Sequence, residues 1–208
     1  MTLPRVGTQV PGIDSKVAQF LGKCVLRVSG WQLVGEVPNL PKFVLIAAPH
    51  TSNWDAFYGF AAILALGMKV NWAAKHTLFP KPLKGVLHAL GGIPIDRTVS
   101  HGVVDQMKEI FARRDKLVLV ITPEGTRRRV PKWRTGFYHM ACAAGIPIQV
   151  GFLDYSRKRL GFGPLITPGR EMATDMAKIQ DFYTNIGAKH PEAFNPDILG
   201  EAAEKAAQ

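Results

Sequence analysis

The sequence contains few cysteines and no long apolar run. Cys24 and Cys142 are its only cysteines, and they lie far apart without a CxxC spacing or a histidine cluster. This argues against a disulfide framework and a cysteine metal site, and it favours buried thiols in a reducing compartment. The longest uncharged stretch that looks helical, Ala56 to Met68, falls short of the roughly 20 residues of a spanning helix. Without the pattern of a secretory signal at residues 1–16, we expect a cytosolic chain with no transmembrane segment.

Several catalytic motifs are missing as well. The sequence has no GxSxG nucleophile elbow, no Walker glycine-lysine loop, no GxGxxG after a strand and no HExxH. These absences argue against serine-hydrolase, P-loop, dinucleotide-binding and zinc-peptidase chemistry. We expect neither a metal nor a bound cofactor. In the absence of an obvious serine or cysteine nucleophile, the simplest remaining chemistry is direct activation of a substrate hydroxyl by a general base.

Positive charge is abundant but unevenly distributed. The net charge is +10, and residues 171–208 hold seven acidic and three basic side chains, a net of −4, so residues 1–170 carry +14. Such an excess raises the local concentration of nucleic acid, anionic lipid headgroups or phosphorylated small molecules. Charge alone does not choose among these partners.

The apolar runs predict an α/β fold with a mostly parallel central sheet flanked by helices. Strand-like runs are separated by helical stretches of about ten residues or more, which implies crossover connections. The predicted strands are 31–37, 43–48, 70–74, 93–95, 117–121, 148–153 and an edge strand at 160–166. The predicted helices are 17–28, 53–66, 80–90, 99–114, 136–144 and 172–186. We divide the chain into an N-terminal segment (1–30), one main domain (31–190) and a C-terminal tail (191–208).

The predicted N-terminal helix is amphipathic. Its apolar stripe is formed by Val17, Phe20, Leu21, Cys24, Val25 and Val28, and its other side by Lys16, Gln19, Lys23 and Arg27. The pattern fits an ordinary helix whose stripe packs on the core. It also fits a helix lying in the interface of an anionic membrane, and the two interpretations can hold in different states.

Polar side chains follow the predicted strands at their carboxyl ends, where open α/β sheets bind ligands. The strand-end candidates are His50, Lys75, Asp96 with Arg97, and Glu124 with Arg127. A neutral imidazole at His50 can accept a proton, and Asp55, in the first turn of the next helix, can hold one ring nitrogen. Taken alone, the pair also fits a core histidine and a capping aspartate.

The segment PEGTRRR follows another strand. Glu124, Gly125 and Thr126 predict a tight turn whose backbone donors, together with Arg127, can bind an anion. Glu124 can order that arginine or hydrogen-bond a substrate hydroxyl. The two following arginines fit a solvated basic loop or contact with lipid headgroups.

Four blocks occur in a defined order: HTSNWD, GGIPIDR, PEGTRRR and GIPIQVG. Over about residues 43–153 they resemble the glycerolipid acyltransferase superfamily, which includes the 1-acylglycerol-3-phosphate acyltransferases. The resemblance implies a glycerol-3-phosphate acyltransferase-like fold, with His50 as general base and Asp55 as its orienting partner. It implies binding of the acceptor's polar or phosphate group by Arg97, Glu124, Gly125, Thr126 and Arg127. It places Pro147 on the acyl-donor side.

The implied activity is transfer of a fatty acyl group from acyl-CoA or acyl-carrier protein to the hydroxyl of a lysophospholipid, such as 1-acylglycerol-3-phosphate, in phospholipid biosynthesis. The expected partners are this acceptor, the thioester donor and an anionic membrane surface, with the protein peripheral on the cytoplasmic face. Pro49 and Thr77 stand where many members have Asn and Glu, so the acceptor pocket, including Lys75, can differ from that of a standard member.

Two alternatives stay open at this level. One is a non-catalytic basic module that binds anionic membrane or nucleic acid, although the absence of an aromatic platform argues against nucleic acid. The other is hydrolysis of the thioester by water at the same site. Comparison of product formation with and without a lysolipid acceptor separates hydrolysis from transfer.

Overall fold

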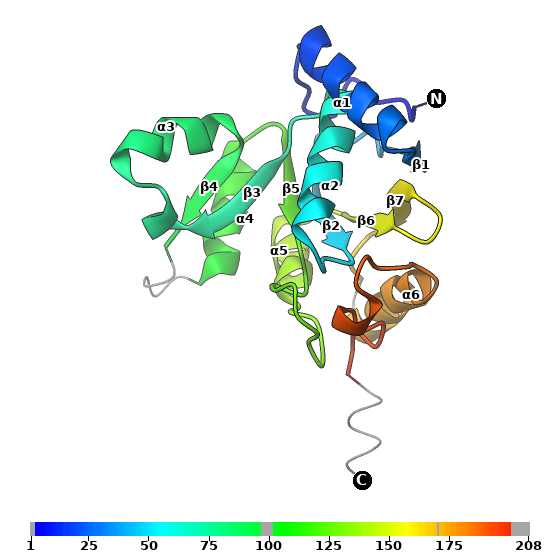
Figure 1. Cartoon of the computed structure of the whole chain (residues 1–208). Helices are drawn as coiled ribbons and strands as arrows, with labels where there is room; N and C mark the ends of the chain where they lie inside the picture. Colours follow the sequence, from blue (N-terminus) through cyan, green and yellow to red (C-terminus); the bar gives the residue numbers. More distant parts are fainter. Residues whose placement is uncertain (1–2, 97–101, 170, 201–208) are drawn as a thin grey trace.

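One seven-stranded sheet forms the centre of the protein (Figure 1). The computed structural model describes residues 3–96, 102–169 and 171–200. The strands are β1 (Gln32–Val34), β2 (Lys42–Ala48), β3 (Asn71–Lys75), β4 (Gly92–Ile95), β5 (Leu117–Ile121), β6 (Ile148–Asp154) and β7 (Arg159–Ile166). Their order in the sheet is β1-β7-β6-β2-β5-β3-β4, and only β6 and β7 pair antiparallel. The predicted α/β fold with a mostly parallel sheet is confirmed.

Helices connect the parallel strands and cover both faces of the sheet (Figure 1). They are α1 (Lys16–Val28), α2 (Asn53–Leu66), α3 (Lys81–Ala89), α4 (Val103–Arg113), α5 (Gly136–Ala144) and α6 (Met172–Thr184), with short 3₁₀ turns η1 (His76–Leu78) and η2 (Pro191–Ala193). Among the described residues no helix has the length and apolarity needed to cross a membrane.

The central strand β2 is apolar from Phe43 onward because both of its faces are covered. Val44 and Ile46 belong to the core cluster shared with α4, α5 and α6. Phe43 and Leu45 belong to the second cluster, shared with α1 and α2. A strand covered on both sides reads as a continuous hydrophobic run, which is why the sequence signal at residues 43–48 is strong.

The edge of the sheet differs from the prediction. The strand expected at 31–37 is only Gln32–Val34, because Gly35 takes a φ of 85° that ends the extended conformation. This short strand pairs with the outer side of β7, so β7 is an inner strand and β1 is the edge. The prediction of 160–166 as the edge strand is therefore wrong. Residues 99–101 of the predicted helix 99–114 lie outside the described residues, and the helix is observed from Val103.

Helix α1 packs on α2 through a face that the apolar stripe does not include (Figure 1). Gly22 and Leu26 are its buried residues. The backbones meet at Gly22, where a Cβ atom would lie 2.5 Å from the carbonyl oxygen of Ala61 and 2.5 Å from the amide nitrogen of Ala65. Only glycine allows this close approach.

The apolar stripe of α1 mostly faces solvent. Val17 is 70% exposed, Phe20 64%, Leu21 55% and Val28 90%. The interpretation that this stripe packs on the core is therefore wrong for these four residues. The face with Gly22 and Leu26 packs instead, so these four apolar side chains turn outward.

Candidate active site

The loop after β2 carries His50 to the carboxyl end of the sheet. It leaves the strand through a cis peptide bond between Ala48 and Pro49 and enters α2 at Ser52. The Ser52 hydroxyl accepts a hydrogen bond from the amide of Trp54 at 3.2 Å, and Asp55 completes a capping box. A strand end and a helix start thus fix the loop from both sides.

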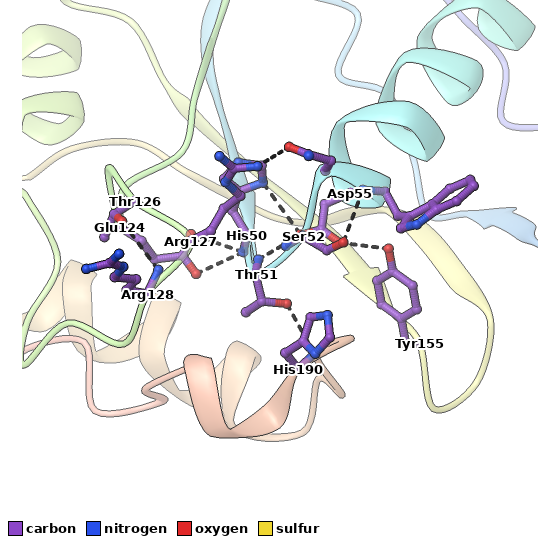
Figure 2. Close-up of polar contacts among 12 residues, drawn as sticks. His50, Thr51, Ser52, Asp55, Glu124, Thr126, Arg127, Arg128, Tyr155 and His190 are labelled. Carbon is purple, nitrogen blue, oxygen red and sulfur yellow. Dashed lines mark hydrogen bonds and ion pairs between the residues drawn. The ribbon is translucent and has the colours of Figure 1, made fainter.

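The Asp55 carboxylate orders this loop and faces the imidazole (Figure 2). Its Oδ2 accepts hydrogen bonds from the amides of Thr51 and Ser52, both at 2.7 Å. The same oxygen lies 3.6 Å from Nδ1 of His50, and Asp55 itself is buried. The same carboxylate thus caps α2 and lies beside the imidazole.

Tyr155 provides a further donor to the aspartate. Its phenol donates a hydrogen bond of 2.7 Å to Oδ1 of Asp55, from the turn after β6 (Figure 2). Burial, together with the bond to Asp55, raises the pKa of Tyr155, so the phenol keeps its proton and remains a donor. Both carboxylate oxygens are therefore fixed before any substrate binds.

Glu124 holds the backbone of the loop that carries His50. The amide of His50 donates to Oε1 at 2.9 Å and to Oε2 at 3.1 Å (Figure 2). The side chain is buried, and burial raises the pKa of Glu124 from 4.5 to about 7. The expectation that Glu124 orders the neighbouring arginine is not met, because among the described residues its hydrogen bonds go to His50.

Arg127 lies on the same side of the molecule as the imidazole. Its guanidinium donates a hydrogen bond to the side-chain oxygen of Asn53, at the first turn of α2 (Figure 2). The arginine is exposed, so its remaining donors are accessible. The pairing bridges the turn after β5 and the start of α2, and brings a fixed positive charge close to His50.

The turn that carries Arg127 needs glycine at its centre. Gly125 has a φ of 67°, in the left-handed region, and its amide donates to the carbonyl of Thr122 at 3.1 Å. The Thr126 hydroxyl accepts a hydrogen bond from the amide of Arg128 at 3.3 Å. The predicted tight turn is present, and these two residues shape it.

Three effects set the pKa of His50. Burial lowers its pKa most strongly, the Asp55 carboxylate raises it, and the Arg127 guanidinium lowers it. The net result is a pKa below 6.5. The imidazole is therefore neutral at neutral pH, which is the form that can accept a proton.

Of the remaining predicted residues, the structure describes Lys75 and Pro147, and neither is brought to the imidazole. Lys75 ends β3 and is exposed, and none of its described contacts reaches His50. Arg97 lies outside the described residues. Pro147 precedes β6, at the opposite end of the sheet: Ala48 pairs with Phe152, so Pro147 is about 16 Å away along the strands. Its carbonyl accepts the amide of Val44 at 3.0 Å, which indicates a structural role at the strand start.

Two contributors to the site escape prediction from sequence. Asn53, in the first turn of α2, accepts a hydrogen bond from Arg127, 74 positions further along the chain. Tyr155 lies 100 positions from Asp55, and no local pattern marks it. The one available signal was its place directly after the strand-ending Asp154, at the same edge of the sheet as His50.

One cleft, of about 740 Å³, lies between β7 and α6 and contains none of the predicted site residues. The second, of about 370 Å³, is lined by Tyr155 among others. We place the active site by the geometry around His50 and not by cleft size. Among the described residues no group of three metal-ligating side chains comes together.

Comparison with known proteins agrees with this geometry. The acyltransferase family model matches residues 34–150, a segment that contains His50, Asp55 and Arg127. The chain therefore belongs to the acyltransferase family.

A curated relative is the 1-acyl-sn-glycerol-3-phosphate acyltransferase of Escherichia coli (strain K12). It is 32% identical over 108 residues, which cover 49% of this chain and 42% of that enzyme. The match thus spans less than half the length of the relative.

A solved structure has the same fold. It is the crystal structure of the 1-acyl-sn-glycerophosphate acyltransferase of Thermotoga maritima, with a TM-score of 0.53 and 16% sequence identity. The superposition covers 92% of this chain and 79% of that one.

Proposed function

We propose that the protein transfers a fatty acyl group from a thioester to the hydroxyl of a lysophospholipid, with 1-acylglycerol-3-phosphate as the acceptor. The observation that carries the proposal is the placement of His50, with a neutral imidazole, close to both the Asp55 carboxylate and the Arg127 guanidinium. The names of the relatives support the same acceptor class. We propose the same activity for this chain, whose curated match spans less than half of that enzyme.

The chemistry requires one base and no covalent enzyme intermediate. His50 removes the proton of the acceptor hydroxyl as the oxygen attacks the thioester carbonyl. Asp55 stabilises the imidazolium that forms, because its carboxylate lies 3.6 Å from Nδ1. Collapse of the tetrahedral intermediate breaks the carbon–sulfur bond, and the imidazolium returns its proton to the leaving thiolate. The products are the ester and the free thiol.

Arg127 is the proposed binding group for the acceptor phosphate. A guanidinium offers several donors in a fork that matches phosphate oxygens, and the bond to Asn53 fixes its direction. The phosphate and the reacting hydroxyl of one acceptor then contact Arg127 and His50 together. In this role Arg97 and Lys75 remain predictions from the sequence.

We propose that the protein acts at a membrane surface, on the cytoplasmic face. The outward stripe of α1 contains Phe20, Leu21 and Val28, and α2 adds the half-exposed Trp54 and Phe57. Exposed apolar side chains on packed neighbouring helices are typical of surfaces that bind lipid. On α1 they are flanked by exposed basic residues, namely Lys16, Lys23 and Arg27, which suit anionic headgroups.

The test is to incubate the purified protein with a labelled acyl thioester and a panel of lysophospholipids, and to identify the products by mass. Separate reactions with acyl-CoA and acyl-carrier protein determine the donor. The expected result is label in a diacyl phospholipid, with the phosphomonoester acceptor preferred over acceptors with capped phosphates. Release of free fatty acid at the same rate with and without acceptor would instead identify a hydrolase.

A further inference from the structure

A cleft of about 370 Å³ lies on the far side of Asp55 from His50. It is lined by Ser29, Trp31, Trp54, Tyr58, Tyr155, Lys158 and Lys189. The family match covers residues 34–150, so only Trp54 and Tyr58 of this lining belong to it. The elements that meet here are the end of α1, the start of α2, the β6–β7 turn and the segment after α6.

Aromatic rings form the floor of the cleft. The Trp31 ring lies 4.8 Å from that of Tyr58 and 4.9 Å from that of Tyr155. Trp54 stacks on Tyr58 at 6.0 Å and is 49% exposed. These contacts make a rigid floor, because rings packed against one another lose little further freedom when a ligand binds.

Two lysines at this cleft have no anionic partner among the described residues. The Lys189 ammonium lies over the Trp54 ring at 4.9 Å, and the Lys158 ammonium donates to the carbonyl of Ser29 at 3.1 Å. In the described part of the chain neither lysine lies within ion-pair distance of a carboxylate. Two unneutralised charges at one concave site attract an anion.

Lys158 occupies a position that does not favour a lysine. Its φ of 48° lies in the left-handed region, where it is the only described non-glycine residue. A side chain there costs about 1 kcal/mol relative to glycine. Glycine would adopt this turn conformation without that cost. The presence of a lysine here therefore indicates that its side chain has a function.

The neighbours of the cleft indicate where its ligand comes from. Ser29 directly follows Val28, which is 90% exposed, and the Trp54 ring contacts that of Phe57 at 5.5 Å. The cleft therefore opens beside the outward apolar surface of α1 and α2. An amphipathic ligand can keep its acyl chains along that surface while its headgroup enters the cleft.

We propose that this cleft binds the phosphate of an anionic phospholipid headgroup, in addition to the acceptor that reacts at His50. Lys158 and Lys189 hold the phosphate, and Trp54 covers the glycerol side of the lipid. The proposal rests on the proposed membrane association. The bound bilayer lipid would be separated from Asp55 by a single side chain, because Tyr155 lines the cleft and donates a hydrogen bond to Asp55.

The experiment titrates the full chain in solution with dihexanoyl phosphatidylglycerol, a short-chain phosphodiester that lacks the monoester phosphate of the proposed acceptor. Trp54 fluorescence is the readout, with Trp54→Phe as the blank. The double variant Lys158→Gly with Lys189→Ala removes both charges, and glycine keeps the turn because it adopts the same φ freely. The matched control is Lys84→Ala with Lys108→Ala, two exposed lysines on α3 and α4. Further arms contain inorganic phosphate, coenzyme A or the neutral dihexanoyl phosphatidylcholine.

The expected result is a saturable fluorescence change with the anionic lipid that weakens at least tenfold in the cleft variant and not in the control. Phosphatidylcholine should give no such change. Equal responses in the two double variants would overturn the proposal, as would tighter binding of coenzyme A than of the lipid, which would assign the cleft to the donor. Acyl transfer measured on the same proteins tests the proposed function separately.

Discussion

The phenol of Tyr155 donates a 2.7 Å hydrogen bond to Oδ1 of Asp55, while Oδ2 of the same carboxylate faces His50. The tyrosine thus contacts the orienting carboxylate from the side away from the base. A hydrogen bond from a neutral donor spreads the carboxylate charge and weakens its attraction for the imidazolium. In the proposed mechanism Tyr155 is therefore a positioning residue that also tunes the pKa of His50.

Tyr155→Phe is expected to move the acidic limb of the kcat/KM pH profile to higher pH. Without the phenol, Asp55 attracts the imidazolium more strongly and raises the pKa of His50. The matched control is Tyr138→Phe, which removes a 2.9 Å bond to Asp175 away from the site. A lower rate with an unchanged pH profile in Tyr155→Phe would mean that the tyrosine has only a structural role.

Arg127→Met is expected to lower kcat/KM for a phosphorylated acceptor by about 10- to 100-fold, because a hydrogen bond to a charged group contributes about 1.5–3 kcal/mol. The loss should shrink for an acceptor whose phosphate is absent. Removal of the nearby positive charge should also raise the pKa of His50 and move the acidic limb of the kcat/KM pH profile to higher pH. Arg128→Met, in the same turn, is the control. Equal losses for both acceptors would contradict phosphate binding by Arg127.

Glu124→Gln is expected to change the pH dependence of stability. In the folded protein the pKa of Glu124 is raised from 4.5 to about 7, so its stabilising contribution is fully present below pH 4.5 and is lost as pH rises through 7. The total loss is about 3 kcal/mol. Glutamine stays neutral and still accepts from the amide of His50.

The measurement is the free energy of unfolding by denaturant between pH 5 and 8. The difference between Glu124→Gln and wild type should grow toward alkaline pH, in favour of the variant. Glu109→Gln, on the exposed face of α4, should follow wild type. A constant difference across this range would show that Glu124 is ionised throughout.

Gly22→Ala tests how α1 is attached. A methyl group there would meet the α2 backbone at 2.5 Å, so the helices must separate, at a cost of about 1–3 kcal/mol. Gly59→Ala, in the middle of α2, has no atom within 4 Å of the added Cβ and should stabilise by about 0.5–1 kcal/mol. Thermal unfolding of both variants measures the contrast. Stabilisation of similar size by both would mean that α1 is not held closely against α2.

The sequence predicted the central strands well because burial on both faces makes them continuous apolar runs, as at Phe43–Ala48. It also predicted the helix at 53–66, which is observed as α2 with its cap at Ser52. The orientation of α1 could not be predicted, because the closest approach depends on Gly22, which adds nothing to an apolar stripe. The prediction of the edge strand also failed. The true edge strand β1 has only three residues, and it pairs with β7, which is distant in the sequence.

At the site, the sequence indicated residues that stand at strand ends and missed contacts between distant segments. His50, Asp55 and Arg127 follow strands or begin a helix, so their positions were predictable and the structure brings them together. The contact of Tyr155 with Asp55 spans 100 positions, and that of Arg127 with Asn53 spans 74. The periodicity of apolar residues along the chain does not indicate contacts between such distant segments.

The most direct measurement of the central claim is acyl transfer by His50→Ala, with His139→Ala, an exposed histidine of α5, as the control. General-base catalysis contributes about 100- to 10,000-fold, so the rate of diacyl product formation should fall by at least about 100-fold in His50→Ala alone. Circular dichroism and thermal unfolding should match wild type. Transfer by a folded His50→Ala protein at the wild-type rate would contradict the account.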